Sequence, residues 1–296
     1  EKVSNLDDKK KIKFLHAING DISEDLDKEI DELKKKFSLE NPKLATRQSS
    51  QQVLEIINPI IEEMIGGSAD LTPSNNTKTK TLNPISKNNF KGRFIHYGIR
   101  EHAMAAAMNG MALHKGLIPY SGTFLIFSDY CRPSIRLAAL MGIKVIHVMT
   151  HDSIGVGEDG PTHQPIEQIP SLRTIPNLNV FRPGDATEVA ECWSIAIKSK
   201  NPSVIALSRQ GCEHFRTTFE ESNKSKLGGY EIESDSTKPK VCIIASGSEV
   251  SIARNVKKQL AKEGISCRVV SMPCFELFDQ QPEEYKKSLL ETDGIR

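Results

Sequence analysis

The chain has 296 residues, a length typical of about two domains of roughly 100–200 residues each. Hydrophobic residues make up 38% and charged residues 26%, so the chain can bury an ordinary core and overall disorder is not expected. The 39 basic and 38 acidic residues leave a net charge of +1, which argues against a nucleic-acid or anionic-membrane partner. No apolar run approaches the roughly 20 residues that a membrane helix needs.

The six cysteines show no C-x-x-C pair, which fits free thiols in a reducing cytoplasm better than disulfides or a zinc site. The first 40 residues carry two runs of three lysines, Lys9 to Lys11 and Lys34 to Lys36, and do not form a signal peptide. We therefore interpret residues 1–40 as a charged interdomain linker and expect the chain to be part of a longer protein.

Hydrophobic spacing predicts a first helix over residues 22–37, where apolar side chains recur on one stripe. A second helix is expected over 46–58, because the residue before a proline, here Pro59, disfavours helical backbone. Residues 64–70 predict a short strand that enters a loop. The stretch 71–90, rich in Thr, Asn, Ser, Lys and Pro, predicts that loop.

From residue 93 onwards, strand-like and helix-like segments alternate. Strands are predicted at 93–97, 117–121, 143–149, 178–181 and 203–207, and helices at 101–114, 124–140, 165–172 and 185–199. This alternation predicts an α/β fold with a mostly parallel sheet and helices on both faces. The helix over 101–114 is almost all small or apolar, so we expect it to be buried or packed at an interface.

The polar stretch that starts near residue 210 marks a boundary. Beyond it, the sequence from CIIASG to ISCRVVSM predicts a β-α-β unit whose helix is capped by Ser248 and closed by Gly264. About one and a half such units are too little chain to bury a complete core. We therefore divide the chain into a domain at 41–225 and a partial second α/β domain at 226–296.

One loop, from His151 to Gln164, combines two histidines, three acids and three glycines between a strand-like and a helix-like run. Glycine adopts left-handed backbone without steric cost, so this composition favours a shaped loop. Its histidines and carboxylates offer donors and acceptors to a polar ligand, and such loops often carry binding and catalytic residues. The loop is therefore a candidate site.

Residues 155–160 within this loop match the dinucleotide fingerprint G-x-G-x-x-G. That motif needs its first glycine directly after a strand, its third inside a helix and an acid about 20 residues further on. Here five residues separate the predicted strand from Gly155, Pro161 follows the third glycine, and no acid stands at the required distance. We therefore reject dinucleotide binding by this motif.

Five segments, ATRxxSQ, GGSADLxPSN, HYGIREHAM, HDSIGVGEDGPTHQP and LSRQ, occur in an order that resembles the transketolases, which depend on thiamine diphosphate. The resemblance runs from about Pro42 to about Tyr285. It implies the thiamine-diphosphate-binding fold, with the pyrimidine-binding domain at 41–225 and part of the C-terminal domain after it. The family's G-D-G…N motif is absent, so the resemblance implies that the ligands of Mg2+ or Ca2+ lie in an N-terminal domain outside this chain.

The resemblance also assigns a cofactor end of the site. Glu101 would be catalytic, as the carboxylate that binds N1′ of the aminopyrimidine ring. Phe124, Phe127 and Tyr130, spaced on one predicted helical face, would form the pocket for that ring; without the resemblance, such a stripe is usually core. The positions expected near the cofactor, with less support from the motif, are Asp70 and Leu71.

The resemblance also assigns residues to a substrate end of the site. The resemblance implies that four residues hold the sugar phosphate: Arg47, Ser74, His163 and Arg209. His151 and Asp159 would contact the sugar hydroxyls, and His151 and His163 are also predicted to be catalytic. Without the resemblance, the arginines would be surface ion pairs and Ser74 a turn former. No role is assigned to the remaining two candidates, His96 and His102.

The resemblance implies transfer of a two-carbon ketol unit from a ketose phosphate to an aldose phosphate in the pentose phosphate pathway. It implies a homodimer with cofactor sites at the subunit interface, and a chain that is inactive alone. Enzymes similar to dihydroxyacetone synthase or deoxyxylulose-phosphate synthase remain alternatives. The loop at His151 and the GGSADL segment favour transketolase over deoxyxylulose-phosphate synthase, but they do not separate it from dihydroxyacetone synthase. A non-catalytic fragment that supplies only a dimer interface and half a site is a further alternative.

Overall fold

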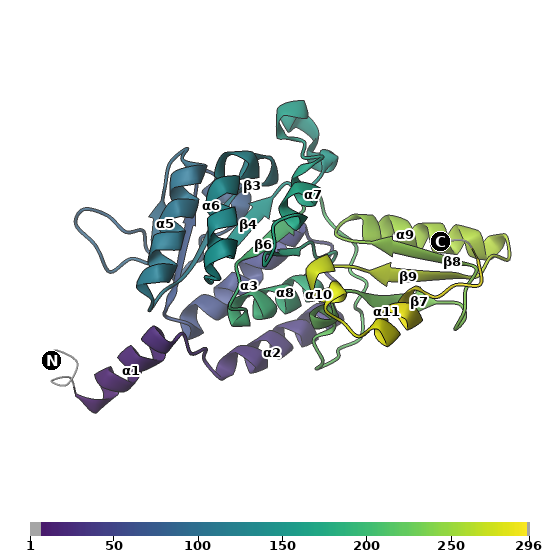
Figure 1. Ribbon diagram of the computed structural model, residues 1–296, viewed down its shortest axis with the longest axis horizontal. Coiled ribbons are helices and arrows are strands. Elements are labelled where there is room, and N and C mark those ends of the chain that lie inside the picture. The colour runs from purple at the N-terminus through teal and green to yellow at the C-terminus, as the bar shows by residue number, and fades with distance from the viewer. Residues whose placement is uncertain (1–6, 295–296) are drawn as a thin grey trace.

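The computed structural model describes residues 7–294 and contains two β-sheets. The larger sheet has six strands in the order β2-β1-β3-β4-β6-β5, and every neighbouring pair in it is parallel. The smaller sheet has three strands in the order β7-β9-β8 (Figure 1). The strands are β1 (Met64–Ser68), β2 (Phe94–His96), β3 (Ile118–Phe124), β4 (Ile146–Thr150), β5 (Asn179–Phe181), β6 (Ser203–Leu207), β7 (Tyr230–Ser234), β8 (Val241–Ala245) and β9 (Cys267–Ser271).

Helices connect these strands and cover the larger sheet. They are α1 (Asp8–Asn19), α2 (Asp25–Glu40), α3 (Thr46–Ile60), α4 (Thr72–Asn75), α5 (Glu101–His114), α6 (Ser128–Met141), α7 (Gln168–Arg173), α8 (Ala186–Lys198), α9 (Glu249–Lys262), α10 (Phe275–Asp279) and α11 (Glu283–Leu290). None of the helices within residues 7–294 is long and apolar enough to cross a membrane.

The larger sheet is buried on both faces. Alternate strand residues such as Ile146 and Val148 share a core with α2, α3 and α8, whereas Met149 and Val204 share a core with α5, α6 and α7. A strand covered on both sides is mostly apolar on both faces, which explains the near-continuous apolar run before His151. The predicted class, a mostly parallel α/β sheet with helices on both faces, is confirmed (Figure 1).

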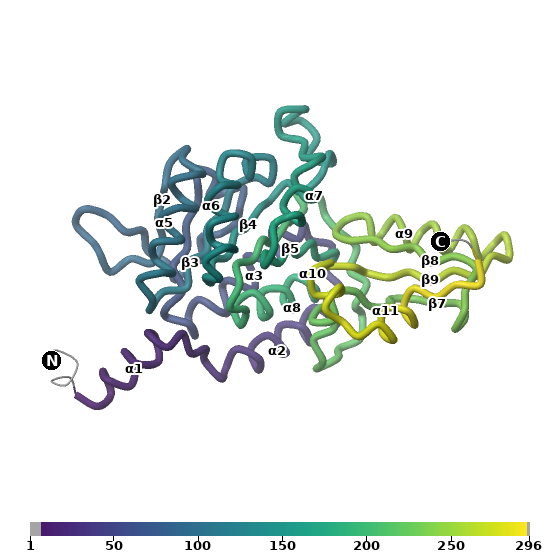
Figure 2. Tube along the Cα trace, in the orientation of Figure 1, coloured from purple at the N-terminus to yellow at the C-terminus, as the bar shows by residue number. Residues whose placement is uncertain are grey.

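Part of the segment interpreted as a linker belongs to the core of the domain. In α2 the side chains of Leu26, Ile30, Leu33 and Phe37 are at most 3% exposed and join the cluster under the sheet. The stripe that predicts this helix is therefore a packing face. Helix α1, by contrast, has no buried residue and projects from the body of the molecule (Figure 2).

Several element boundaries differ from the sequence prediction. Pro59 lies inside α3, in its last turn, where only one residue remains before the helix ends. Strand β3 continues to Phe124, and a short 3-10 turn, Leu125–Phe127, precedes α6, so the helix predicted over 124–140 begins four residues later. The predicted loop after β1 contains the one-turn helix α4.

The smaller sheet contains the predicted β-α-β unit as β8, α9 and β9. Gly264 has the left-handed backbone expected at the end of α9, with φ of 67°, but Ser248 makes no side-chain cap. Strand β7, antiparallel to β9, was not predicted because its sequence, YEIES, lies in a stretch that is polar overall. Helices α10 and α11 were also not predicted.

Buried polar contacts connect the smaller sheet to the domain that contains the larger sheet. Glu188 on α8 accepts hydrogen bonds from the Tyr230 hydroxyl at 2.6 Å and the Ser271 hydroxyl at 2.5 Å. Arg182 donates from Nε to Asp152 at 2.9 Å and forms an ion pair with Glu249. These contacts attach the smaller sheet to the end of α8 and to the loop after β4.

Candidate active site

The candidate residues gather at one edge of the larger sheet. Asp70 follows β1, Phe124 ends β3, His151 follows β4 and Arg209 follows β6. Since these strands are parallel, all four positions lie at the carboxyl edge, which is where open α/β sheets bind ligands. Residues separated by more than 130 positions in the sequence are therefore neighbours in space.

Aromatic rings form the centre of this edge. Phe124 stacks on His151 with 3.7 Å between ring centroids and on Phe127 at 5.8 Å, and Phe127 lies 5.8 Å from Tyr130. The three rings are neighbours, but they do not lie on one helical face as predicted. Phe124 belongs to a strand, Phe127 to a 3-10 turn and Tyr130 to α6. Phe124 is 6% exposed and Tyr130 63%, so the row runs from the core to the surface.

Glu101 is the first residue of α5, where a carboxylate complements the helix dipole. Its side chain is 7% exposed, and it has no hydrogen-bond or ion-pair partner among residues 7–294. Burial raises the pKa of Cys131 to about 12, and the negative charge of Glu101 adds to this effect. The Cys131 thiol in turn donates to the Phe127 carbonyl at 3.8 Å, so Cys131 neighbours both Glu101 and the turn that carries Phe127.

A chain of hydrogen bonds holds His151. The Ser68 hydroxyl donates to Asn75 Oδ1 at 2.9 Å, Asn75 Nδ2 donates to Thr150 Oγ1 at 2.8 Å, and Thr150 Oγ1 lies 3.0 Å from His151 Nδ1. The Thr150 hydroxyl can donate its own proton to Nδ1 or accept one from it, and in either case one nitrogen of the neutral His151 ring is a donor. None of Ser68, Asn75 and Thr150 is predicted from the sequence to be a site residue, because their contacts join segments far apart along the chain.

The pKa of His151 is lowered to about 4, first by burial and then by the nearby charge of Arg47. His151 is therefore neutral at physiological pH and can donate from one ring nitrogen. Its backbone has φ of 60°, an uncommon left-handed conformation for a residue other than glycine. Strain of this kind at a carboxyl-edge position is typical of functional sites.

Two guanidinium groups form a cationic end of the site. Arg47, in the first turn of α3, donates to the Ser74 carbonyl at 2.7 Å. Burial lowers the pKa of Arg47, and the charge of Arg209 lowers it further, so the two groups lie close together. Arg209 forms an ion pair with Glu158, whereas Asp159 attracts Arg47.

The glycine-rich loop consists of two short 3-10 segments, Ile154–Asp159 and Pro161–His163. Gly157 and Gly160 have φ of 78° and 75°, the left-handed backbone for which glycine is suited. No strand-turn-helix is formed here, in agreement with the rejection of dinucleotide binding. The loop brings the His163 ring to 5.9 Å from Phe124 and 5.3 Å from Phe127, both edge-on.

The other candidates lie at the margin of this group. Asp70 is exposed with φ of 61°, and the Leu71 amide donates to the Ser68 hydroxyl at 3.2 Å. His102 lies 3.4 Å from the Ser134 hydroxyl on α6, and His96 packs edge-on against Phe94. Within residues 7–294 no group of three or more His, Cys, Asp or Glu side chains is arranged to hold a metal ion.

The parallel sheet and the polar, aromatic-lined site at its carboxyl edge define a ligand-binding α/β domain. The family profile described as "Transketolase, pyrimidine binding domain" matches residues 42–213, and "Transketolase-like TK C-terminal domain" matches residues 228–296. The first profile covers more than half of the chain, and the chain belongs to the transketolase family.

Individual relatives agree with this assignment. Transketolase from Sinorhizobium medicae is 58% identical over 250 residues, which are 84% of this chain and 36% of that relative. The structure of transketolase from Pichia stipitis in complex with sedoheptulose-7-phosphate superposes with a TM-score of 0.87 at 40% identity, over 95% of this chain and 42% of that one. A structure titled "Split gene transketolase, inactive beta4 tetramer" has a TM-score of 0.67 at 26% identity, over 83% of this chain and 76% of that one. The chain thus spans well under half of the full-length relatives.

Proposed function

We propose that this chain provides the pyrimidine-binding half of a transketolase active site, in a protein that moves a two-carbon ketol unit from a ketose phosphate to an aldose phosphate. The observation that carries the proposal is the Glu101 carboxylate. It lies in a largely buried position at the start of α5, has no partner among the described residues and shares the neighbour Cys131 with the turn that holds Phe127. A carboxylate that no protein group engages is available to hydrogen-bond a ligand.

The residues present fit thiamine diphosphate. Phe127, Phe124 and Tyr130 would hold the aminopyrimidine ring by offset stacking, and Glu101 would share a proton with its N1′ atom. When bound, the cofactor supplies the carbon nucleophile and the electron sink for ketol transfer. Asp70 and Leu71 would border this pocket. We propose that its diphosphate, with Mg2+ or Ca2+, is held by the portion of the relatives that this chain does not span.

The cationic end fits the phosphate of a sugar phosphate. Arg47 and Arg209 offer guanidinium forks, whose planar geometry suits phosphate oxygens, and Ser74 and His163 would add donors. Neutral His151 would donate to a sugar oxygen near the reacting carbons, and the exposed Asp159 would accept from a hydroxyl. The sugar-phosphate complex of the Pichia stipitis relative supports this substrate class.

A second copy of the chain fits the outer face of α5 and α6. That face exposes small residues of α5 and large apolar ones nearby, namely Ala103, Ala106, Ala107, Gly110, Leu113, Leu137 and Leu140. Contiguous apolar surface of this kind marks an interaction site. We propose a homodimer through this face. We also propose that the protein lies in the cytoplasm, where its six free cysteines would remain reduced.

The division of the chain into domains at 41–225 and 226–296 is also a proposal. It is supported by the passage of the chain from the larger sheet to the smaller one between β6 and β7.

Substitution of Glu101 tests the cofactor role. In the full-length protein, Glu101→Gln should lower kcat by at least about a hundredfold, since loss of a general acid–base group typically costs 10²–10⁴-fold. Steady-state kinetics with ketose and aldose phosphates measures the effect. Glu283→Gln, which also changes a first-turn glutamate but on exposed α11, is the matched control and should leave kcat unchanged. Near-normal turnover of Glu101→Gln would refute the proposal.

A second proposal is that this chain is a separate subunit of a two-chain transketolase. One observation favours it: the chain covers 76% of the split-gene transketolase structure, but only 42% of the transketolase structure from Pichia stipitis. In that case residues 1–296 would be inactive alone and become active with a chain matching the first part of the relatives. Mixing the two purified chains with thiamine diphosphate and Mg2+ and assaying ketol transfer distinguishes this from a fused polypeptide. No activity in any mixture would refute it.

A further inference from the structure

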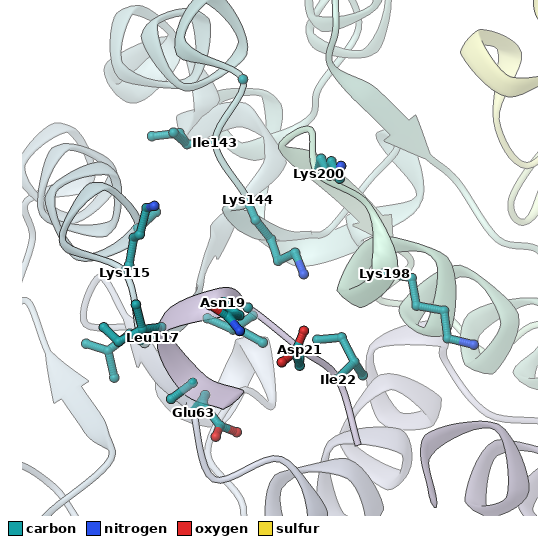
Figure 3. Close-up of a pocket in the computed structure, with 17 residues that line it drawn as sticks. Asn19, Asp21, Ile22, Glu63, Lys115, Leu117, Ile143, Lys144, Lys198 and Lys200 are labelled. Atoms are coloured by element: carbon teal, nitrogen blue, oxygen red, sulfur yellow. The ribbon is translucent and has the colours of Figure 1, made fainter. Parts of the chain in front are cut away.

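A second concavity lies at the opposite edge of the larger sheet. It has a volume of about 720 Å³, within the range of roughly 300–1,000 Å³ for small-molecule sites. Its walls are the end of α1 and the loops that precede β1, β3, β4 and β6, all at the amino ends of those strands. Figure 3 shows the side chains around it. The residues of the candidate active site do not contribute to this cavity.

Four lysines line the cavity: Lys115, Lys144, Lys198 and Lys200. Lys198 forms an ion pair with Asp27 and points away from the cavity in Figure 3. The ammonium groups of the other three have no ion-pair partner among residues 7–294. The chain as a whole has a net charge of +1, so this gathering of unpaired lysines is a local feature.

Lys144 is the central member of this group. It is partly buried, and in Figure 3 its ammonium group points into the cavity. Burial lowers the pKa of Lys144, and no carboxylate offsets this effect. An ammonium group that loses hydration without gaining a counterion is unfavourable, so an anion held here would restore the missing interaction.

The remaining walls indicate what kind of anion fits. Two acids, Asp21 and Glu63, line the cavity together with the three unpaired lysines, and Glu63 also lies 3.7 Å from His16. Aliphatic side chains supply an apolar wall, among them Ile18, Ile22, Leu117 and Ile143. A lysine-lined site with an apolar wall suits a molecule that carries phosphate at one end and a less polar body at the other.

We propose that this amino-edge cavity binds a small organic phosphate, with the phosphate on Lys144 and Lys200 and the less polar body against Ile18 and Leu117. The site is distinct from the cationic end at Arg47 and Arg209, because the two lie at opposite ends of the same parallel strands. The proposal does not depend on the activity at the carboxyl edge.

Calorimetric titration of the full-length protein, saturated with thiamine diphosphate, tests the proposal with adenosine monophosphate as the probe. The double variant Lys144→Gln/Lys200→Gln should weaken binding by about tenfold or more, because charge-assisted contacts to phosphate are lost. Lys198→Gln, which changes a paired lysine of the same cavity, is the matched control and should bind normally. Adenosine, which lacks the phosphate, should bind at least about tenfold more weakly than adenosine monophosphate.

Two outcomes would overturn the proposal. One is binding that survives Lys144→Gln/Lys200→Gln but is lost in Arg47→Gln/Arg209→Gln, which would place the probe at the carboxyl edge. The other is equal affinity for adenosine and its monophosphate. Acetylation of surface amines followed by mass spectrometry is an independent readout: the probe should protect Lys144 and Lys200 but not Lys198. A Lys144 amine that is already unreactive without the probe would also count against an open site.

Discussion

At the scale of single residues, the ion pair between Arg209 and Glu158 bears on the substrate binding that we propose for the cationic end of the site. Arg209 is one-third exposed and Glu158 about three-quarters exposed, so the pair is easily broken by a competing anion. Arg209 lies close enough to Arg47 for its charge to lower the pKa of that guanidinium. In the absence of substrate, Glu158 thus neutralises one of two adjacent cations, and a sugar phosphate would have to displace it.

Glu158→Gln should therefore strengthen binding of phosphorylated substrates. Exposed ion pairs are worth about 0.2–1 kcal/mol, so the KM for a ketose phosphate should fall by about two- to fivefold, with no change for an unphosphorylated ketose. Steady-state kinetics on both substrates in the full-length protein measures the difference. Glu167→Gln, an exposed carboxylate beyond the same loop, is the control. An equal change for both substrates would contradict the competition.

At the scale of secondary-structure elements, the site depends on contacts between β1, α4 and β4. Helix α4 is only one turn long, yet its Asn75 side chain is fully buried and bonds to Ser68 on β1 and Thr150 on β4. These bonds hold the strand end that carries His151, and α4 also carries Ser74, whose carbonyl receives the Arg47 guanidinium. One short helix thus links the sugar-hydroxyl and phosphate ends of the site.

Asn75→Ala would leave the Ser68 and Thr150 hydroxyls buried without this partner. We expect the free energy of unfolding to fall by about 1–3 kcal/mol, because an unsatisfied buried polar group keeps its desolvation cost. We also expect kcat to fall, since Thr150, which holds the His151 ring, loses the bond that orients its hydroxyl. Urea unfolding and steady-state kinetics on the full-length protein measure the two effects. A variant with unaltered stability and turnover would show that the hydrogen-bond chain is dispensable.

At the scale of the whole molecule, buried carboxylates on α8 attach the smaller sheet to the larger one. Glu188 accepts from Tyr230 and Ser271, and its pKa is raised from the ordinary 4.5 to about 7, first by burial and then by the charge of Asp185. Asp185 itself accepts from the Phe215 and Arg216 amides of the connecting segment. The joint between the units is therefore sensitive to pH.

The direction of that sensitivity follows from proton binding. Between pH of about 4.5 and 7 the folded protein keeps a proton on Glu188 that the unfolded chain has released, so the free energy of unfolding falls as pH rises through this window. The effect is on the order of 3 kcal/mol. The glutamine side chain of the variant Glu188→Gln cannot ionise, so the free energy of unfolding of this variant should depend less on pH. Unfolding can be followed through the fluorescence of Trp193, the single tryptophan of the chain, which is buried on the same helix. Parallel pH profiles of variant and wild type would contradict this, and exposed Glu284→Gln is the control.

Much of the fold and of the candidate site can be predicted from the sequence, because hydrophobic periodicity and motif order are local properties. They place α5 at 101–114, identify the alternating strands and single out Glu101, Phe127 and the loop after His151. Phe124 shows the limit: three apolar positions at helical spacing span a strand end, a 3-10 turn and a helix, because the strand's pairing with β4 extends it to residue 124.

Only the tertiary structure decides which distant side chains meet. The bond from Asn75 to Thr150, the pairing of Arg209 with Glu158 and the lysine cavity all join residues from different strands or their flanking loops. Parallel pairing brings the carboxyl ends of all strands to one edge of the sheet and their amino ends to the other. The spacing of residues along the chain does not indicate which of these ends are neighbours. The sequence by itself thus determined most of the elements, the family and the candidate residues, whereas the sheet order brought those residues to one edge of the sheet and the cavity lysines to the other.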